Sequence, residues 1–218
     1  REGRSAHISA FKRFSAKTMK KREVSMTNLI KGESEIEGLS LVTGVSGSGK
    51  SFLLDKAKFD PEVHVLDLDT IGAKSSDDKW VVDVAKIPSS TDVVVGTSDN
   101  LIEVAKAMRD LYDAGEPLTM YWIEPSPDIF RKSVAAKAKE VDSDCPFIKD
   151  WLESSKWSDD KVRKYISAKL MLLSGKIKPE ELVIVSNDDA KSEIVHGYHK
   201  PTTDPEGPVP SKDDSKTE

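Results

Sequence analysis

Short apolar runs alternate with amphipathic stretches through the middle of the chain. Five of these runs predict β-strands, and their near-continuous apolar character is typical of strands buried on both faces of a parallel sheet. The predicted strands span residues 39–43, 63–69, 92–97, 118–123 and 182–187. Each run is followed by polar or turn-forming residues, as expected where a strand ends.

Segments with helical periodicity separate the predicted strands. The expected helices span residues 49–59, 101–114, 147–155 and 159–173, and a further helix opens at Pro127. Residues 80–85 are compatible with a strand or a helix, and we favour a short helix. The alternation of strand and helix predicts an α/β fold in which a five-stranded parallel sheet carries helices on both faces.

The two ends of the chain differ in composition from its middle. Residues 1–36 are interpreted as a basic arm and polar linker, with a frayed helix over residues 11–19. The domain is expected to cover residues 37–196. Residues 197–218 contain four prolines and few apolar residues, which predicts a disordered tail.

Charge is distributed unevenly along the chain, whose net charge is −5. Within the first 25 residues, eight lysine and arginine residues oppose two glutamates. Such an arm can contact nucleic acid or another acidic surface, and a solvated tail without a specific partner is the alternative.

The sequence argues against membrane insertion. No apolar run approaches the roughly 20 residues that a membrane helix needs, and the basic N-terminal segment lacks the apolar part of a secretory signal. Cys145 is the single cysteine, so an intrachain disulfide is excluded. We therefore expect a cytoplasmic, reducing environment, with Cys145 as a half-buried packing residue.

The most informative motif lies between the first predicted strand and the first predicted helix. Residues 44–51 fit the pattern G-x-x-x-x-G-K-S of the phosphate-binding P-loop, or Walker A motif. Small residues let backbone N–H groups curl around a polyphosphate, and the helix that follows adds its positive N-terminal end. Lys50 can reach the β- and γ-phosphates of ATP or another nucleoside triphosphate, and the Ser51 hydroxyl can ligate Mg²⁺. The expected nucleotide-binding residues are Gly44, Val45, Ser46, Gly47, Ser48, Gly49, Lys50, Ser51 and Phe52.

Two acidic residues close the second predicted strand. Asp67 and Asp69 lie two positions apart, and we expect only one of them to face the nucleotide. We expect Asp69 to orient an acceptor hydroxyl, while Asp67 assists Mg²⁺ through water. Solvated acids at a strand end are the alternative.

The motif resembles that of the P-loop NTPase superfamily, and the downstream pattern is similar to its nucleoside/polynucleotide-kinase-like branch, which includes zeta-toxin-like proteins. Three segments carry the second resemblance: residues 65–69, Gly96-Thr97 with the polar residues that follow, and residues 124–131. The resemblance implies a three-layer P-loop fold, an acceptor-holding acid in the first segment, and a phosphate-covering arginine at Arg131.

The chain departs from the family pattern in the region that would cover the nucleotide. A second arginine is expected shortly after Arg131, but the cations there are Lys132, Lys137 and Lys139. The helical stretch 141–181 is long for a minimal kinase and is interpreted as an insert or lid that binds the acceptor. Within it, Trp151 and Trp157 are expected to anchor helices rather than stack on bases.

Three functions remain open at this point. The favoured one is a kinase that transfers the γ-phosphate of Mg-ATP to a hydroxyl of a nucleoside, nucleotide, nucleic-acid end or small metabolite. A motor or packaging ATPase acting on nucleic acid is ranked second, because the third predicted strand ends in Gly96-Thr97 rather than in adjacent acids. The third is a non-catalytic nucleotide-binding assembly protein, and a homo-oligomer is possible.

Overall fold

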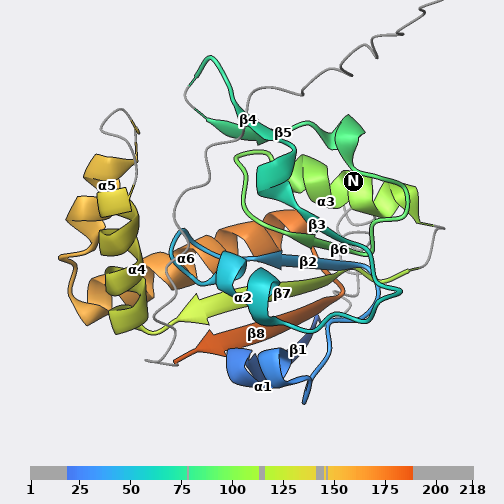
Figure 1. The fold of residues 1–218 in the computed structure, drawn as a ribbon, viewed down its shortest axis with the longest axis horizontal. Helices are drawn as coiled ribbons and strands as arrows, with labels where there is room; N and C mark the ends of the chain where they lie inside the picture. Colours follow the sequence, from blue (N-terminus) through green and yellow to red (C-terminus); the bar gives the residue numbers. More distant parts are fainter. Residues whose placement is uncertain (1–18, 78, 113–115, 141–144, 146, 189–218) are drawn as a thin grey trace, which may run out of the picture.

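The computed structural model describes residues 19–188, apart from 78, 113–115, 141–144 and 146. These residues form an α/β fold around a six-stranded parallel sheet with the order β1-β8-β7-β2-β6-β3 (Figure 1). The strands are β1 (Lys20–Ser25), β2 (Ser40–Thr43), β3 (Val65–Asp67), β6 (Val93–Val95), β7 (Thr119–Pro125) and β8 (Glu181–Asn187). A separate antiparallel pair consists of β4 (Gly72–Lys74) and β5 (Trp80–Val82). The parallel α/β architecture expected from the sequence is confirmed.

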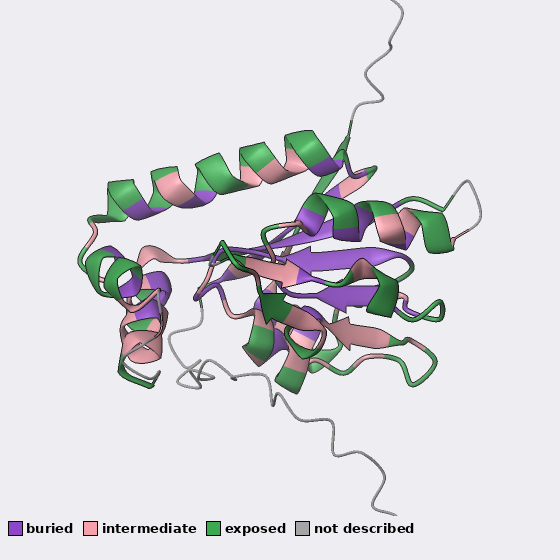
Figure 2. Ribbon diagram, turned by 90° about the horizontal axis from the view of Figure 1, so that it is seen from above, coloured by how far each residue is buried: buried purple, intermediate pink, exposed green. Residues whose placement is uncertain are grey.

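Helices cover both faces of the sheet. Helices α1 (Met26–Lys31) and α2 (Lys50–Lys56) lie on one face, and α3 (Leu101–Leu111) and α6 (Asp159–Ile177) lie on the other (Figures 1 and 2). Helices α4 (Pro127–Glu140) and α5 (Ile148–Ser154) lie beyond the carboxyl ends of the strands (Figure 1). None of the helices in the described part of the chain combines the length and the apolar character that crossing a membrane requires.

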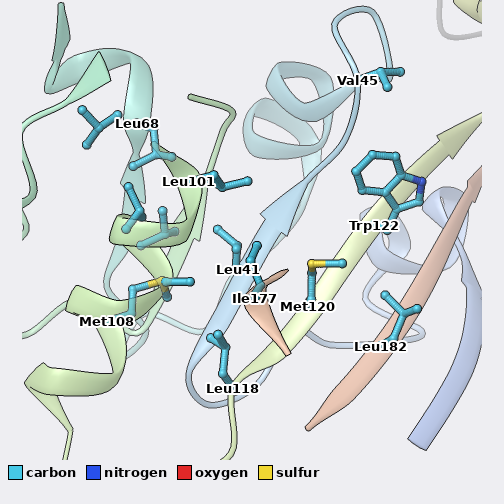
Figure 3. Packing of buried hydrophobic residues seen from close by; sticks show 14 of the residues in the cluster. Leu41, Val45, Leu68, Leu101, Met108, Leu118, Met120, Trp122, Ile177 and Leu182 are labelled. Atoms are coloured by element: carbon cyan, nitrogen blue, oxygen red, sulfur yellow. The ribbon is translucent and has the colours of Figure 1, made fainter. Parts of the chain in front are cut away.

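Alternate residues of each strand pack into two hydrophobic cores, one on each face of the sheet. This explains why the strands are apolar almost without interruption. On the α3 and α6 side, Leu41, Met120 and Leu182 pack with Met108 of α3 and Ile177 of α6 (Figure 3). The opposite core contains residues of the strands and of α1 and α2. Its buried members include Val42, Tyr121, Ile123, Val183, Val185, Met26, Leu29 and Leu53.

The sixth strand corrects the predicted boundary between arm and domain. Residues 20–25, assigned to the basic arm, form β1 and pair in parallel with β8, from Lys20 opposite Glu181 to Ser25 opposite Ser186. The segment lacks an apolar run because it is an edge strand, where exposed charged side chains protect against unwanted strand pairing. Most of the expected helix at 11–19 and all of the tail at 197–218 lie outside the described residues. Nucleic-acid contact by the arm therefore stays a prediction.

Three local predictions also change. Residues 80–85 contain strand β5 and the start of a 3₁₀ turn, Val84–Lys86, instead of a short helix. The second predicted strand is shorter, because β3 ends at Asp67 and a 3₁₀ turn, Leu68–Thr70, follows. Helix α6 continues through Gly175 and ends at Ile177, where Lys178 adopts the left-handed conformation that closes it.

Candidate functional site

A cavity of about 560 Å³ opens at the carboxyl ends of β2 and β6. One wall is the 44–52 segment between β2 and α2, and the other walls come from the segments after β3 and β6 and from α4, α5 and α6. The chain runs from β2 to β3 and β6 on one side and then to β7 and β8 on the other. Parallel α/β sheets bind ligands outside the carboxyl ends of their strands where the strand order changes direction in this way.

The 44–51 loop requires glycine at two positions for steric reasons. A Cβ atom at Gly44 would lie 2.6 Å from the Ser48 Oγ atom and 2.8 Å from the Ile123 carbonyl oxygen. Gly49 has φ +103°, and a Cβ atom there would lie 2.7 Å from the Asn187 Nδ2 atom. The loop is therefore compact and closely packed, and α2 begins immediately after it at Lys50.

Lys50 folds back into the curl of this loop. Its Nζ atom donates hydrogen bonds to the carbonyl oxygens of Gly44 and Val45, both at 2.9 Å. Burial, together with the nearby Lys137 ammonium, lowers the pKa of Lys50 to about 7, against the opposing effects of Asp69 and Asp67. A bound anion would therefore favour the protonated, positively charged form of Lys50.

The structure separates the two acidic residues that the sequence placed at one strand end. Asp69 belongs to the 3₁₀ turn after β3 and lines the cavity, with its carboxylate exposed. Asp67 caps that turn, since its Oδ1 atom accepts a hydrogen bond from the Asp69 N–H at 3.0 Å, and it does not line the cavity. Because β3 ends at Asp67, the 3₁₀ turn and not the alternation of a strand sets the direction of the Asp69 side chain. Of the two carboxylates, that of Asp69 is therefore the better placed to contact a ligand in the cavity.

Arg131 does not take the position expected of a phosphate-covering arginine. Its guanidinium pairs with Asp128 and Asp159 and donates to the Trp157 carbonyl oxygen at 3.1 Å, so it joins α4 to the start of α6. These partners keep it away from the cavity wall, and the prediction for Arg131 is corrected accordingly. The cation of α4 that lines the cavity is Lys137, close enough to Lys50 and Asp69 for electrostatic interaction.

Two oxygen donors suited to Mg²⁺ line the same cavity as Lys50. The Ser51 side chain, at the start of α2, and the Asp69 carboxylate both line the cavity. Mg²⁺ typically uses one or two protein oxygens, phosphate oxygens and several waters rather than a complete protein cage. The residues present fit that mode. No cluster of three His, Cys, Asp or Glu residues suited to a metal occurs among the described residues.

The polar residues after β6 support the cavity rim. Asn100 is the N-cap residue of α3, although its side chain makes no capping hydrogen bond. Asp99 Oδ2 instead accepts from the Trp80 N–H at 2.8 Å, and Asn100 exchanges two hydrogen bonds with the backbone of Val82. Thr97 Oγ1 donates to the Gly44 carbonyl oxygen at 3.2 Å. These bonds fasten β5 and the 44–51 loop to the segment after β6.

Sequence reasoning missed several residues of the site. Asn187, at the end of β8, is 1% exposed, and its Nδ2 atom donates to the Ser48 carbonyl oxygen at 2.9 Å. Its only sequence signal is an amide directly after an apolar strand. On α6, Lys169 and Lys176 line the cavity. In the sequence they are recognisable only as two lysines seven residues apart, which places them on one face of a helix. That spacing does not indicate that this face lines a cavity.

Comparison with known proteins adds no relative. No protein-family model matches the chain, and no match was found among curated proteins or solved structures. The chemistry must therefore be argued from the site itself. The cavity places the cations Lys50 and Lys137 beside a tight glycine loop and sets the Asp69 carboxylate near them.

Proposed function

We propose that the protein is a P-loop enzyme that transfers the γ-phosphate of Mg-ATP to a hydroxyl group of an acceptor. The observation that carries this proposal is the position of Lys50. Its Nζ atom sits within the curl of the 44–51 loop, and Asp69 lies near it in the same cavity. Phosphoryl transfer needs mainly positioning and neutralisation of charge, and these groups supply both.

The roles follow from the chemistry of each group. The loop N–H groups, the start of α2 and Lys50 hold the β- and γ-phosphates, and Ser51 contributes a ligand to Mg²⁺, which neutralises phosphate charge when bound. The acceptor oxygen forms a bond to the γ-phosphorus while the bond from that phosphorus to the β–γ bridging oxygen breaks, and ADP leaves. The hydroxyl proton passes to the Asp69 carboxylate. Lys137 stabilises the charge on the transferred group, the task first expected of Arg131.

The acidic residues near the loop favour a kinase over an ATPase of the motor or packaging type. Activation of water requires a carboxylate that is free to orient it beside the metal. Among the described residues that line the cavity, only Asp69 and Asp99 carry carboxylates, and Asp99 is bonded to the Trp80 N–H. Glu124, at the end of β7, is exposed and does not line the cavity. The described lining thus offers one available carboxylate in place of the adjacent acid pair expected of a motor ATPase, which favours transfer to a hydroxyl.

The test is a transfer assay with γ-labelled ATP, Mg²⁺ and a panel of hydroxyl acceptors. Lys50→Ala should weaken nucleotide binding at least tenfold, whereas Lys56→Ala, at the exposed end of the same helix, should leave it unchanged. Asp69→Asn should keep nucleotide binding and lower transfer by roughly 10²- to 10⁴-fold, the usual contribution of a general base. Asp77→Asn serves as its control.

Two results would overturn the proposal. The first is ATP hydrolysis at the same rate with and without every acceptor, which would indicate an ATPase. The second is tight ATP binding without any turnover, which would indicate a nucleotide-binding assembly protein. Full transfer activity in Asp69→Asn would remove Asp69 from the mechanism.

A further inference from the structure

The wall of the cavity formed by α4, α5 and α6 has a chemistry of its own. Five residues of α6 line the cavity, and besides Leu173 they follow one another at intervals of four, three and four: Tyr165, Lys169, Leu172 and Lys176. That spacing places them on one helix face. One face of α6 therefore presents an aromatic ring, an apolar side chain and two lysines to the cavity, on an element separate from the 44–51 loop.

The lysines of this wall lack acidic partners. Lys137, Lys169 and Lys176 form no ion pair with any residue in the described part of the chain. Elsewhere on these helices, Arg131 pairs with Asp159, Lys161 with Glu153, and Arg163 with Asp160. The three lysines without an ion pair thus place positive charge along the cavity wall of a chain whose net charge is −5. Such charge favours an anionic ligand.

Aromatic rings stand beside these lysines. The Phe147 and Trp151 rings lie 5.9 Å apart between centroids, and both residues line the cavity with Tyr165. Trp122 also lines the cavity and is fully buried, yet its Nε1 atom has no hydrogen-bond partner among the described residues. An indole N–H can only donate, so a ligand that fills this space should offer an acceptor atom.

The lysines of α6 are also too far apart to serve one phosphate group. Lys169 and Lys176 are separated by seven residues, about 10 Å along a helix axis. They project from a different element than Lys50, which occupies the curl of the loop. Two anionic positions thus exist besides the one that the loop provides. A flat ring between them is what the neighbouring aromatic side chains accommodate.

We infer that the wall formed by α4, α5 and α6 binds the phosphoryl acceptor, and that this acceptor is a phosphate-bearing compound with a planar ring. A free nucleotide and the end of a nucleic-acid strand share this chemistry. The inference rests on the proposed kinase function, which it narrows to anionic, ring-containing acceptors. Lys169 and Lys176 provide two separate positions for the anionic groups of the acceptor, Trp151 and Phe147 contact its ring, and the hydroxyl that reacts faces Asp69.

The experiment measures acceptor binding and transfer separately. Four probes are titrated in the absence of ATP: adenosine, AMP, ribose 5-phosphate, and a single-stranded pentanucleotide with a free 5′-hydroxyl. The same probes then serve as acceptors for Mg-ATP. AMP or the pentanucleotide should bind at least tenfold more tightly than adenosine or ribose 5-phosphate, because only the first two present a ring and phosphate together. Tighter binding of AMP would identify a free nucleotide as the acceptor, and tighter binding of the pentanucleotide would identify the end of a nucleic-acid strand.

Single variants test whether the wall formed by α4, α5 and α6 binds the acceptor. Lys169→Ala and Lys176→Ala should each raise the KM for the acceptor about tenfold and change ATP affinity less than twofold. Lys164→Ala, an exposed lysine of α6 that does not line the cavity, is the matched control and should change neither. Trp151→Leu should weaken AMP binding without affecting ribose 5-phosphate.

Each result decides between the two proposals. Equal use of adenosine and AMP as acceptors would overturn the inference and leave the kinase function intact. Variants of Lys169 and Lys176 that weaken ATP rather than the acceptor would also overturn it. Tight, lysine-dependent AMP binding without any transfer would retain the subsite and overturn the kinase function.

Discussion

The Asn187 side-chain amide donates a hydrogen bond to the Ser48 carbonyl oxygen across 2.9 Å, so the end of β8 holds the loop that follows β2. Both residues are buried. Asn187→Leu leaves the Ser48 carbonyl unsatisfied, which should lower the free energy of unfolding by about 1–3 kcal/mol. The loop should also lose its fixed shape, and ATP affinity should fall about tenfold. Urea denaturation and equilibrium ATP titration measure the two effects.

The neighbouring residue provides the control for this variant. Ser186 precedes Asn187 in β8, but its hydroxyl donates to the Val24 carbonyl oxygen of β1 instead of to the loop. Ser186→Ala should therefore leave ATP affinity unchanged. If both variants weaken ATP binding equally, the effect belongs to the strand end in general and not to the bond with Ser48.

The lowered pKa of Lys50 predicts that ATP binding takes up a proton. Burial and Lys137 bring this pKa to about 7 in the absence of ligand, so Lys50 is mostly neutral at pH 8. Bound phosphates restore the charged form and raise the pKa again. Calorimetric titrations at pH 8 in two buffers with different ionisation enthalpies should reveal uptake approaching one proton, falling towards zero at pH 6. In Lys50→Arg the uptake should vanish, because arginine stays charged; persistent uptake in that variant would point to another group.

The same group predicts how stability depends on pH. The pKa of Lys50 is about 7 in the folded state, below its ordinary value of 10.5, so burying the charge costs most below pH 7. This cost declines as the pH rises from 7 towards 10.5, because the folded state then binds fewer protons than the unfolded state. Lys50→Met should accordingly stabilise the unliganded protein more at pH 6 than at pH 9, as measured by urea denaturation. A pH-independent effect, like that expected of Lys56→Met, would contradict the buried position of the charge.

Opposite effects of mutation are expected for two of the cations of α4, Arg131 and Lys137. Arg131 is bound by Asp128, Asp159 and the Trp157 carbonyl, whereas Lys137 lines the cavity. Arg131→Met should lower the melting temperature and change phosphoryl transfer less than about threefold, because it loosens α4 from α6 without removing a phosphate contact. Lys137→Met should reduce transfer by roughly 10²-fold or more, by analogy with other cations that stabilise transferring phosphate. The reverse pattern would restore Arg131 as the phosphate-covering residue.

These assignments illustrate what the sequence could and could not predict. The five apolar strands were predictable because burial on both faces leaves a continuous apolar run. Strand β1 was not, since residues 20–25 form a charged edge. The 44–51 motif specifies its own local structure, and the placement of Lys50 follows from it. The positions of Arg131 and Lys137 depend instead on how α4 packs against α6, and only tertiary contacts fix that packing.

Gly72 and Trp80 control the rim of the cavity on the β4–β5 side. A Cβ atom at Gly72 would lie 2.5 Å from Trp80 Nε1, so the indole rests directly on the glycine, and Trp80 in turn lines the cavity. Gly72→Ala should displace the ring and lower the free energy of unfolding by about 1–3 kcal/mol, the usual cost of overpacking. In a Trp80→Leu background the same substitution should cost clearly less, because the smaller side chain leaves room for the methyl group. Urea denaturation of the four proteins in this double-mutant cycle gives the coupling energy. An equal cost in both backgrounds would show that the backbone at Gly72, and not the Trp80 ring, rejects the side chain.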